Sequence, residues 1–236
     1  MKLVVCKSKQ EIAQLCGNKI NELVKNNPNC ILGLATGSSP VETYAEAIRL
    51  SKEQGVSYKN VRSFNLDEYV NYKEEKDSYK FFMYDNFFKY IDIDLKNTNF
   101  PSVSNLDKYD EMIINAGGVD LQVLGIGANG HIAFNEPNTP FESKTHIVNL
   151  TEKTISDNAR FFNSIDDVPT SAMTMGLSTI MMAKEIILIA TGKNKAEAVK
   201  MLIDEEKNVN CPASILQDHN NATIYVDEEA ASLLNK

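Results

Sequence analysis

Long apolar runs, paired cysteines and an excess of basic residues are all missing from this sequence of 236 residues. No apolar stretch approaches the roughly 20 residues that a membrane span requires, and MKLVVCKSKQ at the N-terminus becomes polar too soon for a signal peptide. The four cysteines (Cys6, Cys16, Cys30 and Cys211) form no CxxC pair and have no metal-ligand spacing to a histidine. We therefore expect a cytoplasmic protein with buried, reduced thiols and no metal centre.

Basic residues are in deficit, because 24 Lys and Arg face 32 Asp and Glu, and the formal net charge is -8. This balance argues against attraction to nucleic acid or to an anionic membrane. An anionic ligand would need a local positive site. Because 43% of the residues are hydrophobic, and because repeats, low-complexity tracts and Pro/Gly-rich linkers are absent, the sequence predicts one globular domain over residues 1–236.

Short β-branched runs alternate with longer segments of helical period, which is typical of a mostly parallel sheet with helices on both faces. The expected strands are 3–6, 30–35, 61–66, 121–126, 145–149, 186–190 and 223–226. The expected helices are 8–26, 40–54, 77–90, 105–116, 152–163, 171–183, 194–205 and 227–234. Together they predict a single-domain, doubly wound α/β fold, in which ligands bind beyond the carboxyl ends of the strands.

Two loops that follow expected strands carry anion-binding signals. The loop Thr36-Gly37-Ser38-Ser39 precedes a helix, so its amides and hydroxyls would suit a phosphate. A structural alternative stays open, because Ser39-Pro40-Val41-Glu42 is also a capping box. The second loop places Lys193 and Lys195 near a helix N-terminus, where cations are unfavourable unless an anion lies over the turn. We favour a solvated position for Lys193 and a functional one for Lys195.

Two further loops carry groups that can transfer protons. Asp67 and Glu68 directly follow a strand, either as catalytic groups or as helix caps. The segment GIGANGHIAFNEP at 125–137 contains GxGxxG, typical of a dinucleotide site, and an Asn-Gly pair typical of a hairpin turn. Neither interpretation explains why His131 lies beside Asn129 and near Glu136. An imidazole with a carboxylate and an amide is suited to proton transfer near neutral pH.

Three motifs together, GIGANGHIAFNEP at 125–137, NLDEY at 65–69 and ATGSSP at 35–40, resemble those of the glucosamine-6-phosphate deaminases, in the family that also holds the 6-phosphogluconolactonases. The similarity runs from the first strand to the last and includes NARFF at 158–162. The residues FNEP at 134–137 are similar to the deaminase branch. The resemblance implies a Rossmann-like fold and conversion of D-glucosamine 6-phosphate and water into D-fructose 6-phosphate and ammonia, without a metal or organic cofactor.

The resemblance also implies residue roles. Asp67 matches the base that moves a proton from C2 to C1, and His131 matches the acid/base that opens the sugar ring. Glu136 and Asn129 match the residues that orient this histidine. Many relatives have Asp at the position of Asn129, and an amide orients the ring without stabilising imidazolium by charge. The residues matched to the substrate phosphate are Thr36, Gly37, Ser38, Ser39, Arg160 and Lys195.

Allosteric, hexameric family members carry basic residues in the segment that aligns with 144–148 and continue further at the C-terminus. This chain has His146 and Val148 there and stops soon after residue 227. We therefore expect a monomer that is not activated by N-acetylglucosamine 6-phosphate, with a sugar phosphate as its partner and neither nucleic acid nor membrane. Lactone hydrolysis, a non-enzymatic sugar-phosphate sensor and a dinucleotide-binding oxidoreductase are the alternatives.

Overall fold

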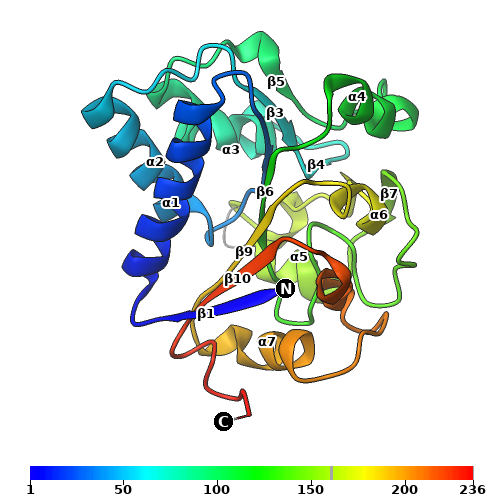
Figure 1. Ribbon diagram of the computed structural model, residues 1–236. Coiled ribbons are helices and arrows are strands. Elements are labelled where there is room, and N and C mark those ends of the chain that lie inside the picture. The colour runs from blue at the N-terminus through cyan, green and yellow to red at the C-terminus, as the bar shows by residue number, and fades with distance from the viewer. Residues whose placement is uncertain (160–161, 236) are drawn as a thin grey trace.

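A computed structural model describes residues 1–159 and 162–235 of the chain, with a central sheet of seven parallel strands in the order β1-β10-β9-β6-β2-β3-β5 (Figure 1). The strands are β1 (Lys2–Cys6), β2 (Ile31–Leu34), β3 (Arg62–Asn65), β5 (Thr98–Asn99), β6 (Leu121–Gly125), β9 (Ile186–Ala190) and β10 (Ala222–Asp227). From β2 the chain proceeds outward to β3 and β5, then returns to β6 on the other side of β2. The strand order therefore reverses between β2 and β6, as in doubly wound folds.

Helices cover both faces of this sheet, which confirms the predicted fold class. They are α1 (Lys9–Asn26), α2 (Val41–Gln54), α3 (Tyr79–Asn86), α4 (Tyr109–Ala116), α5 (Glu152–Asn158), α6 (Leu177–Ile180) and α7 (Ala196–Ile203). Successive strand residues point to opposite faces: Ile187 packs in a core cluster with Ile20 of α1, and Leu188 packs in another with Val199 of α7. In Figure 1, α1 and α2 lie together on one side and α7 on the other.

Several predicted helices are shorter than expected, because part of each forms a 3-10 turn. The 3-10 segments are η1 (Glu75–Asp77), η2 (Phe88–Tyr90), η3 (Leu95–Asn97), η4 (Leu106–Lys108), η6 (Ile165–Asp167), η7 (Lys193–Lys195) and η8 (Pro212–Asp218). The predicted helices at 77–90, 105–116 and 194–205 therefore each divide into an α-helix and a 3-10 turn. Tightened turns of this kind are common at helix ends.

A second, three-stranded antiparallel sheet corrects two predictions. It consists of β4 (Asp67–Tyr69), β8 (Ser171–Thr174) and β7 (His146–Asn149), with β8 in the middle. The strand expected at 145–149 lies here rather than in the central sheet. The helix expected at 171–183 is wrong over its first part and is found only at α6, Leu177–Ile180. Thr174 of β8 pairs with both Asp67 and His146, so strand pairing overrides the local helical period there.

The helix expected at 227–234 is also wrong. Strand β10 continues through Asp227, and turns follow it. The Asp227 carboxylate accepts hydrogen bonds from the backbone N–H groups of Gly192 at 3.0 Å and Ala230 at 2.8 Å. This carboxylate ties the turn to the loop after β9, and Ala230 is buried in the core. The backbone N–H groups of Ala231, Ser232 and Leu234 make separate turn hydrogen bonds that do not add up to a helix.

Two further expectations concern helices and thiols. None of the helices in the described part of the chain combines the length and apolarity needed to cross a bilayer. All four cysteines are free and buried, as predicted. Burial raises the pKa of both Cys16 and Cys30 to about 12, so these thiols stay protonated at neutral pH.

Candidate active site

A cavity of about 520 Å³ lies where the strand order reverses, at the carboxyl ends of β2 and β6. The predicted site residues that line it are Thr36, Gly37, Ser38, Ser39, Asp67, His131 and Lys195. Asn129 and Glu136 lie behind the His131 ring rather than in the wall. Arg160, also a predicted site residue, lies outside the described residues. The chain thus brings together residues separated by more than a hundred positions.

The loop after β2 is held by the side chain of Tyr44 in α2. The Tyr44 hydroxyl donates to the carbonyl of Ala35 at 2.7 Å and accepts from the Ala35 N–H at 3.1 Å. The capping-box alternative is wrong, because α2 begins after Pro40 without a side-chain cap, and Glu42 instead pairs with Lys9 at 2.7 Å. The Ser39 hydroxyl is therefore not consumed by the helix end.

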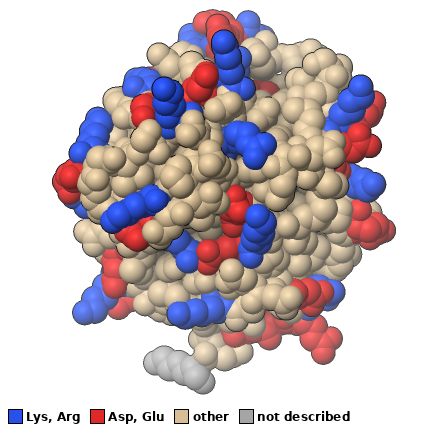
Figure 2. Space-filling model, turned by 45° about the horizontal axis from the view of Figure 1, so that its top comes forward, with Lys and Arg blue, Asp and Glu red and all other residues tan. Residues whose placement is uncertain are grey.

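Lysines supply the positive charge of the cavity. Lys195 ends the 3-10 turn that leads into α7, and it lines the cavity together with Ser38 and Ser39. Lys153 of α5, which the sequence analysis did not single out, lines it as well. Lys193 is exposed and lies outside the cavity wall. Figure 2 shows basic and acidic side chains interspersed over the surface it displays rather than one basic patch, so the positive charge available to a ligand is local.

The adjacent carboxylates Asp67 and Glu68 have different environments. Glu68 accepts the backbone N–H groups of Tyr79 and Lys80 at the start of α3, and so caps this helix together with its N-cap residue Ser78. Asp67 lines the cavity, is 6% exposed, and its Oδ1 atom has no hydrogen-bond partner among the described residues. Burial, and secondarily the charge of Glu68, raise the pKa of Asp67 well above its usual value. Asp67 is therefore a desolvated base open to a ligand.

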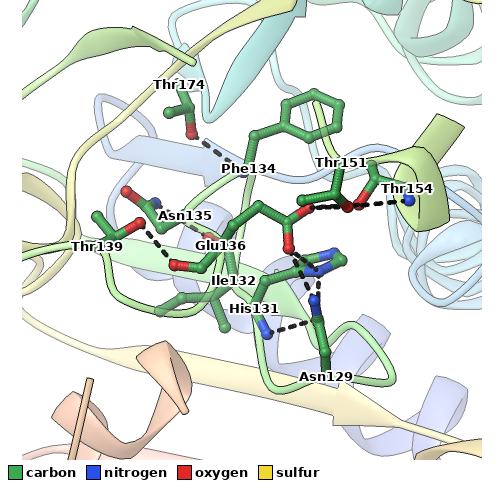
Figure 3. A network of polar contacts seen from close by, with 10 residues as sticks. All are labelled: Asn129, His131, Ile132, Phe134, Asn135, Glu136, Thr139, Thr151, Thr154 and Thr174. Carbon is green, nitrogen blue, oxygen red and sulfur yellow. Dashed lines mark hydrogen bonds and ion pairs between the residues drawn. The ribbon is translucent and has the colours of Figure 1, made fainter. Parts of the chain in front are cut away.

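The His131 ring is oriented through Asn129 and Glu136, as Figure 3 shows. Asn129 Oδ1 lies 2.7 Å from His131 Nδ1, while Asn129 Nδ2 donates to Glu136 Oε2 at 2.7 Å. An ionised Glu136 can only accept hydrogen bonds, so the Asn129 amino group faces it and the Asn129 oxygen faces the ring. The Nδ1 atom must then carry a proton. In the neutral ring this leaves Nε2 with the lone pair.

Glu136 is held in its ionised form by this network. Burial raises its pKa, but the nearby His131 ring and hydrogen bonds from Thr154 and Asn129 outweigh burial and lower the pKa of Glu136 to about 2. The Glu136 Oε2 atom lies 3.6 Å from His131 Nδ1. The Thr154 hydroxyl donates to Oε1, and Thr151, the N-cap of α5, contributes a longer bond of 3.4 Å. Neither threonine was predicted from the sequence.

The glycines of the 125–130 segment leave room for the histidine rather than for a dinucleotide. A Cβ atom on Gly127 would lie 2.2 Å from Cε1 of His131. The Gly127 N–H donates to the His131 carbonyl at 2.8 Å, which closes a tight turn under the ring. Residues 131–139 form no helix, so the helix N-terminus that would hold a pyrophosphate is missing from this described segment.

An aromatic wall, also missed by the sequence analysis, completes the cavity. Tyr69 and Tyr79 lie 4.6 Å apart by ring centroid, and Tyr79 stacks on Phe134 at 5.9 Å and 5°. Asn158 of α5 donates to the Tyr69 hydroxyl at 2.9 Å. Within the described residues, no three His, Cys, Asp or Glu side chains gather closely enough to hold a metal ion.

Comparisons with known proteins agree with the motifs. Residues 7–225 match the family model described as glucosamine-6-phosphate isomerases/6-phosphogluconolactonase. A protein of Mycoplasma mycoides subsp. mycoides named glucosamine-6-phosphate deaminase is 50% identical over 99% of this chain and 98% of its own length. One from Thermoanaerobacter sp. with the same name is 46% identical, over 99% and 95%.

Solved structures show the same relationship. A structure described as a monomeric glucosamine-6-phosphate deaminase superposes with a TM-score of 0.95 and 41% identity, covering 99% of this chain and 100% of the other. A 6-phosphogluconolactonase from Leishmania guyanensis has a TM-score of 0.77 at 15% identity, over 100% and 99% of the two chains. The second comparison shows the shared fold alone.

Proposed function

The chain belongs to the family of glucosamine-6-phosphate isomerases and 6-phosphogluconolactonases, and we propose that it acts as a glucosamine-6-phosphate deaminase. The reaction converts D-glucosamine 6-phosphate and water into D-fructose 6-phosphate and ammonia. One observation carries this proposal: a single cavity holds a desolvated carboxylate, Asp67, and an imidazole, His131, whose Nδ1 is fixed by a neighbouring amide. Ring opening and proton transfer at carbon need two such separate groups.

His131 opens the pyranose ring in this mechanism. Its Nε2 atom accepts the proton of the anomeric hydroxyl and returns it to the ring oxygen. While the His131 imidazole carries the extra proton, its Nδ1 atom lies 3.6 Å from Oε2 of the Glu136 carboxylate, which stabilises the positive charge. Asn129 contributes orientation and no charge, so Glu136 supplies the electrostatic stabilisation in this chain. The network thus supports proton transfer without a metal or an organic cofactor.

Asp67 performs the isomerisation step. It removes the proton from C2 of the open chain, which leaves an enolamine, and returns the proton to C1, which leaves an imine at C2. Water then adds at C2 and ammonia leaves. The raised pKa of Asp67 supports this role, because a desolvated carboxylate is a stronger base than a solvated one. A base must come within about 3 Å of the proton it removes, and a strand end holds it rigidly enough.

The phosphate binds to the loop Thr36-Gly37-Ser38-Ser39 and to Lys195, with Arg160 as a further ligand carried over from the family motif. All four residues of this loop line the cavity together with Lys195, and three of them, Thr36, Ser38 and Ser39, carry hydroxyls. The acidic Glu42 is engaged by Lys9. Binding the remote phosphate provides energy that holds the open chain in register with Asp67. Capture at this wall overcomes the repulsion expected from a net charge of -8.

An ammonia-release assay with glucosamine 6-phosphate tests the proposal. We expect ammonia and fructose 6-phosphate in equal amounts, and no hydrolysis of 6-phosphogluconolactone. Lactone hydrolysis without ammonia release would favour the other branch of the family. Binding of the sugar phosphate without either product would indicate a sensor. Curated relatives that are named glucosamine-6-phosphate deaminase at 50% and 44% identity support the first outcome.

A cytoplasmic monomer without allosteric activation is the form we propose for the enzyme. The solved relative with a TM-score of 0.95 is described as monomeric. In the segment where allosteric relatives carry basic residues, the His146 ring donates from Nδ1 to the carbonyl of Lys144 at 2.8 Å, and Val148 is apolar. Light scattering should give the mass of one chain. Sigmoidal kinetics that N-acetylglucosamine 6-phosphate abolishes would contradict the proposal.

A further inference from the structure

Glu68, the neighbour of the proposed base, is a buried carboxylate whose hydrogen bonds are all directed to the backbone. It is 6% exposed. Its Oε1 atom accepts from the N–H groups of Tyr69 at 2.9 Å and Tyr79 at 2.8 Å, and its Oε2 atom accepts from Lys80 at 2.9 Å. A carboxylate that receives three backbone N–H groups from two segments fixes those segments relative to each other.

These bonds complete the N-terminus of α3. The first N–H groups of a helix have no partner within the helix. Here Glu68 receives those of Tyr79 and Lys80, and Ser78 receives that of Phe81 at 3.0 Å. A negative charge at this end also interacts favourably with the helix dipole. Residues 70–78 form the connection between β4 and α3. Glu68 therefore anchors the end of this connection, at the start of α3, next to β4.

The anchored helix start carries part of the cavity wall. The Tyr79 hydroxyl lies 3.2 Å from that of Tyr69, and its ring stacks on Phe134. Tyr79 lines the cavity together with Asp67. The position of this wall relative to the reacting carboxylate thus depends on Glu68, although Glu68 itself does not line the cavity among the described residues.

Charge is unevenly divided between the two neighbouring carboxylates. Burial raises the pKa of Glu68, but its three N–H bonds and Lys80 act in the opposite direction. The Oδ1 atom of Asp67 receives no such bond from the described residues. When only one negative charge is present, it therefore resides on Glu68, and Asp67 ionises beside it. Burial, and in addition the charge of Asp67, raise the pKa of four tyrosines on the elements packed around Asp67: Tyr44 of α2, Tyr69 of β4, Tyr79 of α3 and Tyr109 of α4. His131 and Lys195 are the other charged or titratable site residues that line its cavity.

We propose that Glu68 is a positioning residue: it holds Tyr79, and with it one side of the cavity, against β4, and it keeps a fixed negative charge next to Asp67. This inference rests on the proposed function, in which Asp67 removes the C2 proton. Glu68 acts only through Asp67 and α3 and does not touch the substrate. Its two contributions, reach and charge, can be separated by substitution.

Three variants separate the contributions. Glu68→Gln keeps the size of the side chain and removes the charge, and Glu68→Asp keeps the charge and shortens the reach. Glu75→Gln, a change at an exposed residue of the same 70–78 connection, is the matched control. The rate of ammonia release is measured from pH 5 to pH 9 for each variant, and kcat and KM are determined separately.

For Glu68→Gln we expect the acid limb of kcat/KM to move to lower pH, because Asp67 then loses its proton without a neighbouring charge. We expect kcat at neutral pH to fall by roughly 10- to 100-fold through the weaker base and the displaced wall, with a smaller change in KM. Glu68→Asp should lower kcat while its acid limb stays closer to that of the wild type. Glu75→Gln should match the wild type both in kcat and in the position of its acid limb. An acid limb that coincides in Glu68→Gln and wild type would overturn the inference.

Amide hydrogen exchange of the substrate-free protein tests the clamp without turnover. The N–H groups of Tyr79 and Lys80 should exchange at least about tenfold faster in Glu68→Gln and Glu68→Asp than in wild type. Unchanged exchange would overturn the inference, and if Glu68→Gln does not fold, Glu68→Asp provides the same readout. Wild-type protein that releases no ammonia would instead overturn the proposed function, so the two failures are distinguishable.

Discussion

Replacing Glu136 by glutamine should destabilise the protein in a pH-dependent way. The glutamine oxygen can accept the Asn129 amino group, now 2.7 Å from Glu136, and its NH2 group can donate to the Thr154 hydroxyl. The substitution therefore preserves the shape and most of the hydrogen bonds of the network. What it removes is the negative charge, which lies 3.6 Å from His131 Nδ1.

The size of the effect follows from the pKa of Glu136. A folded-state pKa of about 2 against an ordinary 4.5 makes the ionised form more favourable in the folded protein by an upper limit of about 3 kcal/mol. Glutamine keeps part of this stabilisation through its hydrogen bonds, so we expect the free energy of unfolding to fall by about 1–2 kcal/mol at pH 7. Because the pKa is lowered on folding, the stabilisation is fully present above pH 4.5 and is lost as the pH falls towards 2.

Urea unfolding at several pH values between 7 and 3 measures this effect. The difference in unfolding free energy between wild type and Glu136→Gln should shrink as the pH falls below 4.5. Glu142→Gln, at an exposed position a few residues on, is the control and should change stability by no more than about 0.5 kcal/mol at any pH. A difference that stays constant over the whole range would refute the reasoning, because it could not arise from the carboxylate charge.

The other predictions concern the histidine. Gly127→Ala places a Cβ atom 2.2 Å from the His131 ring and should lower kcat by about 100-fold, whereas Gly125→Ala, whose Cβ lies 3.7 Å from Ser39, should cost far less. Equal losses in the two alanine variants would show that ring position is not the cause. His131→Gln should slow turnover of the cyclic substrate more than proton exchange at C2 of an open-chain analogue. Similar losses on both substrates would reject a specific role in ring opening.

The parts predicted from sequence were those encoded in short segments. The alternation of strands and helices predicted the central sheet, and the expectation that ligands bind beyond its carboxyl ends pointed to the loops at 36–39 and 125–131, which line one cavity. These features depend on local hydrophobic period and on a general property of parallel sheets. The site residues of these two loops lie in turns, and the glycines of the sequence indicate where the turns are.

The parts that were missed depend on contacts between distant segments. Strand β8 has a helical local pattern, and its pairing with β4, about a hundred residues away, decides its structure. Asp67 and Glu68 are neighbours with the same chemistry. Glu68 is the one at the helix end because the chain comes back beside it at Tyr79, and Asp67 is left to face the cavity. Thr154 reaches Glu136 across a segment with no motif of its own.

The most direct test of the account follows the C2 proton in deuterated water. Wild-type protein with glucosamine 6-phosphate should incorporate solvent deuterium during the transfer between C2 and C1, as detected by proton NMR, and release ammonia. Asp67→Asn should abolish the exchange while binding of the sugar phosphate, measured by calorimetry, stays within about threefold of wild type, because the substitution leaves the proposed phosphate ligands, Thr36 to Ser39 and Lys195, unchanged. Exchange that persists in Asp67→Asn would contradict the assignment of Asp67 as the base.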